Sequence, residues 1–316
     1  MTRLVALGEC MVELRQSDDG TLQMGYAGDM LNSAFYARRT LPGDIDVRFF
    51  SGFGTDRLSH EMLKAIHALG VKTDGSVTVP ERQCGLYMIH LDEGERSFSY
   101  WRSASAARLL ARDITCLRKA LEGAQTVLFS GITLAILEDD GWENLISVIG
   151  ELRRAGIRTA FDPNIRTALW TDLDEMRRRM AAAAAVSSIV LPSYSDEAAH
   201  FGDDSKAATI DRYLAYGADL VALKDGEYGV WIATLGRCEI VPAVTVSCVV
   251  DSTGAGDSFN GIFLARLMMG DTAADAARRA VDGASQVIMH HGAIVSEFQD
   301  QSRNCPFPGT SEASIG

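Results

Sequence analysis

Short apolar runs of β type alternate along this chain with segments of helical periodicity, and this alternation constrains the fold more than any other feature. The β-type runs are residues 4–7, 47–50, 126–130, 159–161, 188–191 and 220–224. The helix-period segments are residues 29–38, 57–69, 142–154 and 173–185. Strands that alternate with helices pair in parallel through right-handed crossovers. The sequence therefore predicts an α/β fold with a mainly parallel central sheet.

Residues 85–91 and 96–102 break the alternation, because two strand-like runs follow each other without a helix between them. The polar residues that join them, 92–95, are typical of a β-hairpin. A hairpin with no following helix tends to project from a parallel sheet, so we expect a small β-sheet lid. Residues near 11–25 are its expected second contribution. Residues 1–301 otherwise form one predicted domain, and residues 302–316 a flexible tail.

The composition argues against several classes of protein. The formal net charge is −12 and no basic run stands out, which argues against nucleic-acid binding. The apolar stretches are too short for a signal peptide or a transmembrane helix. Six scattered cysteines without a C-x-x-C pair are typical of reduced thiols. We therefore expect a cytoplasmic protein that binds neither nucleic acid nor membrane.

The string Asp251-Ser-Thr-Gly-Ala-Gly-Asp257 says most about function. It lies between a β-type run, residues 244–250, and a helical run, residues 258–269. A strand feeding a glycine turn that opens a helix presents free N–H groups at the positive end of the helix dipole, and these attract phosphate. A carboxylate at Asp257 makes sense there if it takes a proton from an attacking hydroxyl, as in a kinase. The alternative is an ordinary connection in which Asp257 is only a helix N-terminal charge.

The longer string Asp251-Ser-Thr-Gly-Ala-Gly-Asp257-Ser-Phe-Asn-Gly261 resembles the C-terminal signature of the ribokinase-like (PfkB) sugar kinases. The resemblance implies a three-layer α/β/α fold with a small β-sheet lid, and Asp257 as the catalytic base. It implies ATP and Mg²⁺ as cofactors and leaves a monovalent cation open. It also implies an anion hole formed by the amides of Gly254, Ala255, Gly256 and Asp257. One departure is Gly261-Ile262, where the family usually has Ala-Gly, at positions expected to pack the helix against the sheet.

Gly28-Asp29-Met-Leu-Asn32 places two polar side chains one helical turn apart. Asp29 and Asn32 would face the same direction and could read sugar hydroxyls together. Asp29 could equally well only cap the helix. The segment resembles the Gly-Gly-Asp-x-x-Asn motif of the same family, with Ala27 in place of the first glycine. The resemblance implies that Gly28, Asp29 and Asn32 bind the sugar.

Two arginines bear on the class of substrate. Arg166 follows Asp162-Pro-Asn164, where a strand should end and where ligands of open α/β sheets gather. Arg102 ends the hairpin in Tyr100-Trp-Arg102. Either arginine alone could be a surface residue, but two converging guanidinium groups suggest a carboxylate. The pair favours a sugar acid, and the resemblance implies that Tyr87 and Tyr100 bind the same substrate. The alternatives are a fructokinase or ribokinase, and a non-catalytic sugar-binding protein of the same fold.

The resemblance also implies a nucleotide side to the site. Lys224-Asp-Gly226-Glu-Tyr-Gly229 resembles the family's glycine turn beside ATP. Where the family commonly has Asn-x-x-Glu, this chain has Ser193 and Asp196, followed by Glu197, so either carboxylate could order the water shell of magnesium. The residues expected to contact ATP are Asn164, Ser193, Lys224, Gly226, Gly229, Gly254 and Gly256. Exposed lid sheets often pair between subunits, so we expect a homo-oligomer, with a dimer through the lid as one arrangement.

Overall fold

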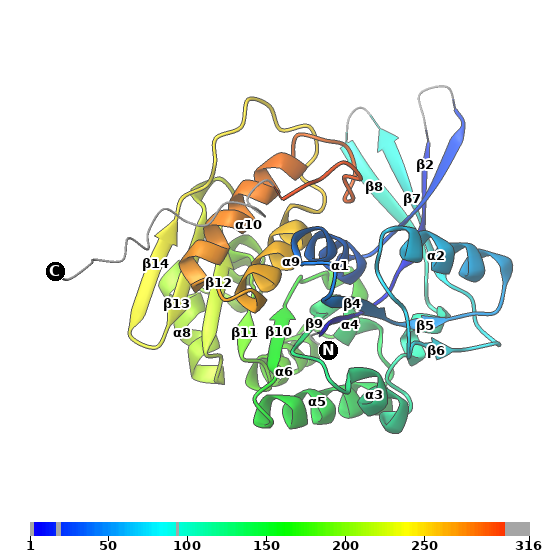
Figure 1. Ribbon diagram of the computed structural model, residues 1–316, viewed down its shortest axis with the longest axis horizontal. Helices are drawn as coiled ribbons and strands as arrows, with labels where there is room; N and C mark the ends of the chain where they lie inside the picture. Colours follow the sequence, from blue (N-terminus) through cyan, green and yellow to red (C-terminus); the bar gives the residue numbers. More distant parts are fainter. Residues whose placement is uncertain (1–2, 17–19, 93–94, 301–316) are drawn as a thin grey trace.

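The computed structural model describes residues 3–16, 20–92 and 95–300, and it confirms the expected α/β architecture (Figure 1). The central sheet has eight strands in the order β14-β13-β12-β11-β10-β9-β1-β4. They are β1 (Arg3–Leu7), β4 (Asp46–Phe50), β9 (Thr126–Ser130), β10 (Arg158–Asp162), β11 (Ile189–Val190), β12 (Leu220–Lys224), β13 (Val230–Thr234) and β14 (Arg237–Val241). From β4 to β12 all neighbours pair in parallel, and β13 and β14 extend the sheet antiparallel at one edge.

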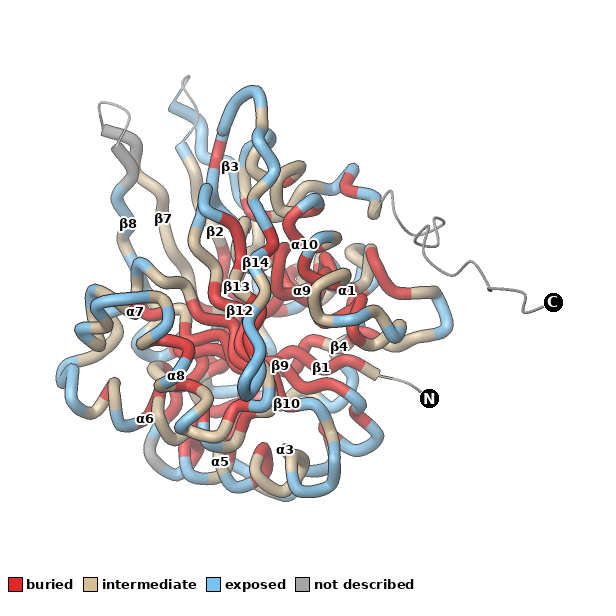
Figure 2. Tube along the Cα trace, turned by 90° about the vertical axis from the view of Figure 1, so that its left-hand side faces the viewer, coloured by how far each residue is buried: buried red, intermediate tan, exposed pale blue. Residues whose placement is uncertain are grey.

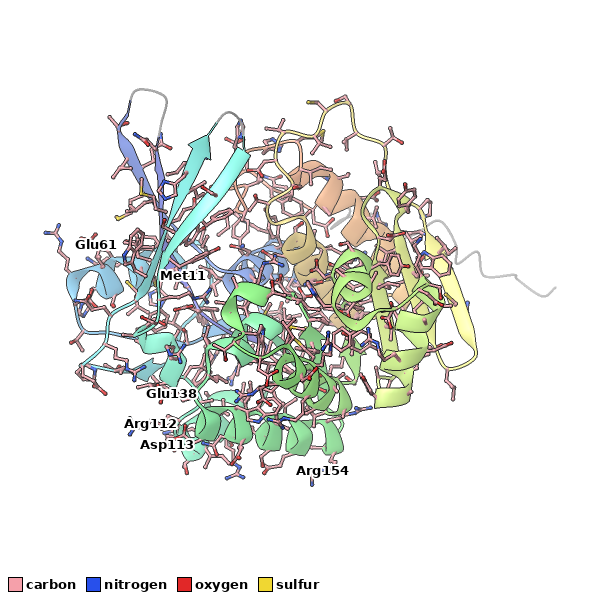
Figure 3. All side chains as sticks on the ribbon, turned by 180° about the vertical axis from the view of Figure 1, so that it is seen from behind. Met11, Glu61, Arg112, Asp113, Glu138 and Arg154 are labelled. Carbon is pink, nitrogen blue, oxygen red and sulfur yellow. The ribbon has the colours of Figure 1, made fainter. Side chains whose placement is uncertain are left out.

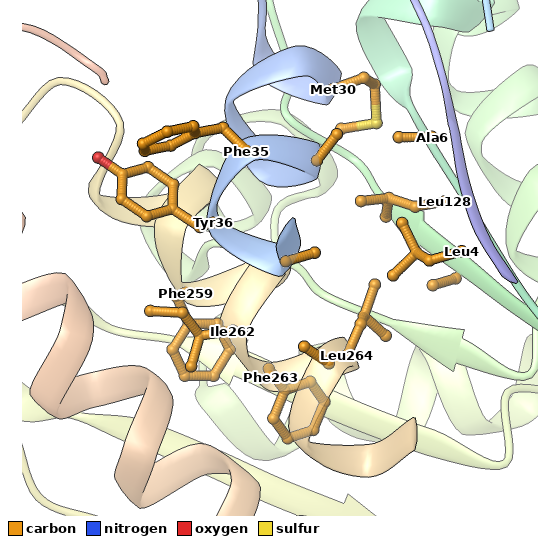
Figure 4. Close-up of a cluster of buried hydrophobic side chains, with 14 of the residues drawn as sticks. Leu4, Ala6, Met30, Phe35, Tyr36, Leu128, Phe259, Ile262, Phe263 and Leu264 are labelled. Atoms are coloured by element: carbon orange, nitrogen blue, oxygen red, sulfur yellow. The ribbon is translucent and has the colours of Figure 1, made fainter. Parts of the chain in front are cut away.

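The central strands bury both of their faces, which produces three layers. Successive side chains of a strand point to opposite faces, so Leu4 and Ala6 belong to one buried cluster and Val5 and Leu7 to another. The first cluster, drawn in part in Figure 4, includes side chains of α1 (Asp29–Thr40), α9 (Ala255–Met268) and α10 (Ala273–Val287). The second includes side chains of α3 (Ile114–Leu121), α5 (Asp139–Arg154), α6 (Leu173–Ala185) and α8 (Lys206–Tyr216). Burial on both faces explains why these strands read as continuous apolar runs.

A second sheet contains the hairpin that the sequence predicted, and we refer to this sheet as the lid. Its strands are β2 (Met11–Gln16), β3 (Leu22–Ala27), β7 (Gly85–Asp92) and β8 (Glu95–Trp101), in the order β3-β2-β7-β8. β7 and β8 pair antiparallel, and β2 pairs in parallel with β7. The lid projects from the body beside α2 (Arg57–Ala68), and much of its outer part is exposed, whereas burial concentrates in the central sheet (Figures 1 and 2). Both predicted lid segments therefore belong to one sheet.

The expected strand over residues 244–250 is wrong. Residues 242–250 form neither helix nor strand, and Val244, Val249 and Val250 are 43%, 58% and 40% exposed. The last strand before the glycine motif is β14, an antiparallel edge strand. Valines favour strands only where a neighbouring strand is available for pairing and packing, and this run crosses the surface after the sheet has ended. Helix α9 also begins earlier than expected, at Ala255 instead of residue 258.

Other expectations concern the C-terminal tail, membrane-spanning helices and the cysteines. The tail expected over residues 302–316 lies outside the described residues. Within residues 3–16, 20–92 and 95–300, no helix is both long enough and apolar enough to cross a membrane. The cysteines in these ranges are all free thiols, as their scattered spacing predicted.

Candidate active site

The N-terminal ends of α1 and α9 lie together because the two helices pack closely. Gly261 on α9 faces the backbone of α1, where a Cβ would collide with the carbonyl of Ser33 and lie 3.0 Å from the amide nitrogen of Ala37. The sequence expectation that this position packs the helix against the sheet is therefore wrong, because its contact is with another helix. This close approach brings the first turn of α1 against the first turn of α9.

The central contact of the site joins Asn32 of α1 to Asp257 of α9. Asn32 Nδ2 donates a hydrogen bond of 2.7 Å to Asp257 Oδ2. Asn32 is buried, and its Oδ1 has no hydrogen-bond partner among the described residues. A buried amide oxygen without a partner is costly unless a ligand supplies a donor. The arrangement therefore suits a ligand hydroxyl that donates to Asn32 beside the Asp257 carboxylate.

The electrostatic surroundings of Asp257 raise its pKa to about 7. Burial is the largest cause, because it disfavours the charged carboxylate, and the negative charges of Asp29 and Asp162 act in the same direction. The hydrogen bond from Asn32 and the positive charge of Lys224 lower the pKa, but they do not cancel the increase. A carboxylate of this kind can exchange a proton near neutral pH.

Asp29 makes one contact typical of a helix N-terminus and one that goes beyond it. Its Oδ1 accepts a hydrogen bond of 2.9 Å from the amide of Met30, and its Oδ2 accepts one of 2.9 Å from Asn164 Nδ2. Asn164 has a φ of 33°, which is uncommon for a non-glycine residue. Burial raises the pKa of Asp29. The sequence expected Asn164 to contact ATP, but its contact with Asp29 places it beside the residues expected to read the sugar.

A second polar cluster, made of Asp162, Lys224 and Asn260, lies at the ends of β10 and β12 and on α9. Asn260 Nδ2 donates to Asp162 Oδ2 over 2.7 Å. Lys224 Nζ donates to Asn260 Oδ1 over 3.1 Å and lies 3.4 Å from Asp162 Oδ1. Lys224 Nζ also lies 3.7 Å from where a Cβ of Gly256 would be, so its charge faces the glycine turn. Asp162 and Asn260 stand within the motif strings, but no feature of the sequence predicted their pairing.

The start of α9 is shaped to leave its first turn open. Gly254 is the N-cap with a φ of 79°, and a Cβ there would lie 2.7 Å from the Ala293 carbonyl oxygen. Among the described residues, no side chain caps this helix. The amide of Ala255 donates to the carbonyl of Ser252 at 3.2 Å. The Ala255 amide is thus already bonded. Of the four amides expected to form the anion hole, those of Gly256 and Asp257 are better placed to bind an anion.

The two arginines expected to converge on a carboxylate are each paired within the protein. Arg102 Nη2 forms an ion pair with Glu9 Oε2, and the two side chains are 10% and 1% exposed. Arg166 Nη1 lies 3.8 Å from Asp196 Oδ2, and its side chain is 54% exposed. No role for Glu9 was predicted from the sequence, although Gly8-Glu9 directly follows the first strand. Arg102 is thus held by a buried partner, whereas Arg166 is more exposed and its Nη1 also donates to the Ile165 carbonyl at 2.9 Å.

The tyrosines of the lid form an aromatic group on one face. Tyr87 and Tyr100 are opposite each other in β7 and β8, with ring centroids 6.0 Å apart. Phe98 stacks beside Tyr100 at 6.1 Å. The Tyr87 hydroxyl donates a hydrogen bond to Glu13 of β2. Tyr100 is 51% exposed, so this face retains area that a bound molecule could cover.

Of the two carboxylates considered for magnesium, Glu197 is excluded by its contacts. It is completely buried in α7 (Tyr194–Phe201), where the Tyr213 hydroxyl donates to it at 2.9 Å and Arg212 at 2.8 Å. Asp196 is partly exposed and faces Arg166, and burial raises its pKa. Among the described residues, no group of three or more His, Cys, Asp or Glu side chains could hold a metal ion. Asp196 therefore remains the candidate, acting through water.

The turn after β12 carries the residues expected on the nucleotide side. Gly226 and Gly229 have φ values of 54° and 91°, which favour glycine. A Cβ at Gly229 would collide with the Val241 carbonyl, so this turn packs against the end of β14. Ser193 forms a parallel bridge with Lys224. The structure thus places Ser193 and Lys224 side by side next to this turn.

The site combines a glycine turn, an open helix N-terminus and an aspartate of raised pKa near the ends of parallel strands. These are features of an enzyme that transfers phosphoryl groups. Residues 1–300 match the family described as pfkB family carbohydrate kinase. The chain belongs to this family.

Two relatives make the likeness more specific, and one solved structure shares the fold. A 2-dehydro-3-deoxygluconokinase of Haemophilus influenzae is 34% identical over 306 residues, which cover 94% of this chain and 96% of that protein. A 2-dehydro-3-deoxygluconokinase of Dickeya dadantii is 35% identical over 299 residues, covering 92% and 96%. A putative ribokinase II of Escherichia coli, solved in complex with ATP and Mg²⁺, matches with a TM-score of 0.82 at 20% identity, covering 96% of this chain and 98% of that one. The last likeness concerns the fold alone.

Proposed function

We propose that this chain transfers the γ-phosphoryl group of ATP to the C6 hydroxyl of 2-keto-3-deoxygluconate, giving 2-keto-3-deoxy-6-phosphogluconate. The observation that carries the proposal is the contact between Asn32 and Asp257, which puts a group suited to sugar hydroxyls beside a carboxylate suited to accept a proton. The relatives from Haemophilus influenzae and Dickeya dadantii, whose names refer to this sugar acid, support the choice of substrate.

In this mechanism Asp257 is the general base. As the C6 oxygen attacks the γ-phosphorus, its proton passes to the Asp257 carboxylate and the bond between the γ-phosphorus and the leaving ADP oxygen breaks. A base with a pKa of about 7 is well matched to this transfer near neutral pH. The amides of Gly256 and Asp257, together with Gly254 and Ala255 of the same turn, stabilise the charge on the phosphoryl oxygens.

The sugar acid is held between the body and the lid. Asp29 and Asn32 bind its hydroxyls, with the Gly28 backbone close by. Arg102 and Arg166 bind its carboxylate, since guanidinium groups form strong paired hydrogen bonds with carboxylates. Arg102 contributes more than Arg166, because it is far less exposed to solvent. The remaining sugar contacts that we propose are Tyr87 and Tyr100 of the lid.

ATP approaches from the side of β12. The ammonium group of Lys224, next to Gly256, neutralises part of the charge on the phosphates, and Gly226 and Gly229 let the backbone approach the nucleotide. Asp196 would hold Mg²⁺ through an ordered water, and the ion would supply positive charge to the phosphates. The Escherichia coli structure with ATP and Mg²⁺ supports this pair of ligands. The other proposed ATP contacts are Ser193 and Gly254, together with Asn164, which also donates to Asp29 on the sugar side.

We also propose that the protein acts in the cytoplasm as a homodimer joined through the lid. Phe98 and Trp101 of β8, an edge strand, are 47% and 59% exposed. An exposed edge with large apolar side chains favours pairing with a second sheet. The molecular mass in solution tests this arrangement, because a monomer at assay concentrations contradicts it.

The function is tested by measuring ATP turnover with 2-keto-3-deoxygluconate, fructose, ribose and gluconate. The proposal predicts the highest kcat/KM with 2-keto-3-deoxygluconate and a product phosphorylated at C6. A preference for fructose or ribose would replace it with the neutral-sugar alternative. Binding of a sugar with no ATP turnover would instead favour a non-catalytic sugar-binding protein.

A further inference from the structure

Glu9 lies where the chain passes between the body and the lid. The lid joins the body after β1, after β3, before β7 and after β8. Glu9 itself follows β1. A Cβ on Gly28, after β3, would collide with the Glu9 carbonyl, and a Cβ on Gly85, at the start of β7, would lie 2.8 Å from Glu9 Oε1. Arg102, after β8, forms an ion pair with the Glu9 carboxylate. Glu9, which lies in the first connection between body and lid, thus contacts the other three connections.

Glu9 precedes β2, the first strand of the lid, by two residues. Figure 3 shows Met11, two residues after Glu9, where β2 leaves the body, with the lid strands above it and Arg112, Asp113 and Arg154 below it in that view. The lid strands converge toward this base (Figure 1). Movement of the lid relative to the body would therefore act on the environment of Glu9.

The ion pair between Glu9 and Arg102 is buried, so it restricts the orientation of the Arg102 guanidinium group. A buried pair is retained only when geometry and further contacts offset the desolvation of both charges, and removal of one partner leaves the other uncompensated. Burial raises the pKa of Glu9, and Arg102, Ser105 and Arg108 act against that increase. Rotation of the Arg102 guanidinium away from Glu9 is therefore unfavourable.

Arg102 keeps hydrogen-bonding capacity for a ligand. Its Nη2 is directed to Glu9, whereas its Nε has no hydrogen-bond partner among the described residues. A guanidinium group has five N–H donors in a fixed plane. A carboxylate that binds the donors on one edge of this plane therefore also sets the direction of the remaining donors. An error of about 1 Å in such a group can lower activity by roughly a hundredfold.

We propose that Glu9 is a positioning residue for substrate recognition, which holds the Arg102 guanidinium in the orientation that receives the substrate carboxylate and ties that orientation to the base of the lid. The inference rests on the proposed function of Arg102 in binding a sugar acid. Glu9 does not touch the substrate. Its effect passes through Arg102.

A double-mutant cycle tests the inference. Glu9→Gln keeps the size of the side chain but removes its charge, and it should raise KM for 2-keto-3-deoxygluconate about tenfold while changing KM for ATP less than about twofold. In an Arg102→Ala background, Glu9→Gln should change KM for the sugar acid by less than about twofold, because the group it positions is gone. Glu61→Gln is the control, since Glu61 on α2 makes a solvent-exposed pair with Arg57.

Three outcomes would overturn the inference. Equal effects of Glu9→Gln with and without Arg102 would show that Glu9 acts independently of it. A lower KM for the sugar acid would show that Glu9 competes with the substrate for Arg102. Equal increases in KM for both substrates would show a general structural role. If Glu9→Gln does not fold, Glu9→Asp replaces it in the cycle, and loss of folding by both variants also counts against a positioning role.

Hydrogen exchange of the free protein separates this inference from the substrate assignment. Glu9→Gln and Arg102→Ala should each speed amide exchange in residues 85–90, and the double variant should add nothing further. If wild type prefers fructose, the sugar-acid assignment fails, yet this exchange result still decides whether Glu9 and Arg102 act together at the base of the lid. Unchanged exchange in both single variants would reject that link.

Discussion

Asn32 and Asp257 are 225 residues apart in the sequence, and a 2.7 Å hydrogen bond joins their side chains. The close packing of α1 and α9 around Gly261 makes this contact possible. Because both groups stand in the first turns of buried helices, their relative position is fixed before any ligand binds. The proposed sugar-reading group and the proposed base therefore form one preorganised unit, and preorganised groups need little rearrangement during reaction.

The raised pKa of Asp257 predicts an acid limb in the pH–rate profile. The base must be deprotonated, so kcat should rise as the pH increases through about 7 and level off above it. Because the hydrogen bond from Asn32 lowers this pKa, Asn32→Ala should move the limb to higher pH. Profiles of kcat at saturating substrate check both points. A limb below pH 5 in wild type, or a shift to lower pH in the variant, would contradict this explanation.

Replacement of Asp257 tests its role as the base. Asp257→Asn keeps the size of the side chain but cannot accept the proton, so kcat should fall roughly a hundredfold or more. Affinity for ATP should change little, as measured by titration of the nucleotide. Asp211→Asn, at an exposed position of α8, is the matched control and should retain full activity. Near-normal turnover of a folded Asp257→Asn variant would assign the base elsewhere.

The sequence predicted those parts of the site that depend on local pattern. Asp29, Asn32 and Asp257 could be identified because their motifs require particular residues at the start of a helix. Glu9 could not, because its role depends on Arg102, 93 residues away, and on burial that only the folded chain creates. The same holds for Asp162 and Asn260, which are 98 residues apart. The prediction of a strand over the valines of residues 244–250 was wrong, because strand formation depends on a neighbouring strand as well as on propensity.

Closure of the lid should be visible by hydrogen exchange. If the sheet of β2, β3, β7 and β8 covers bound sugar acid, exchange in residues 85–102 should slow at saturating 2-keto-3-deoxygluconate, because closure orders the hairpin. Residues 142–154 of α5, on the far side of the central sheet, supply an internal control. Equal exchange with and without ligand would indicate that the second sheet is a fixed structural element.

The packing of α1 against α9 can be tested through stability. Gly261→Ala should lower the free energy of unfolding by about 1–3 kcal/mol, because the added methyl group meets the backbone of Ser33 and overpacking strains both helices. Gly43→Ala is the control, since a Cβ at Gly43 has no heavy atom within 4 Å. Denaturant unfolding measures both variants. Equal stability of the two would mean that the helices separate without cost.

The most direct test of the proposed substrate class compares kcat/KM for 2-keto-3-deoxygluconate and for fructose in wild type, Arg102→Ala and Arg166→Ala. We predict that wild type prefers the sugar acid and that both substitutions reduce this preference. Arg102→Ala should have the larger effect, about 2 kcal/mol or more, because the side chain is mostly buried. Fructose has no carboxylate to lose, so its kcat/KM should change much less. A wild-type preference for fructose, or equal losses for both substrates, would show that the arginines do not recognise a carboxylate.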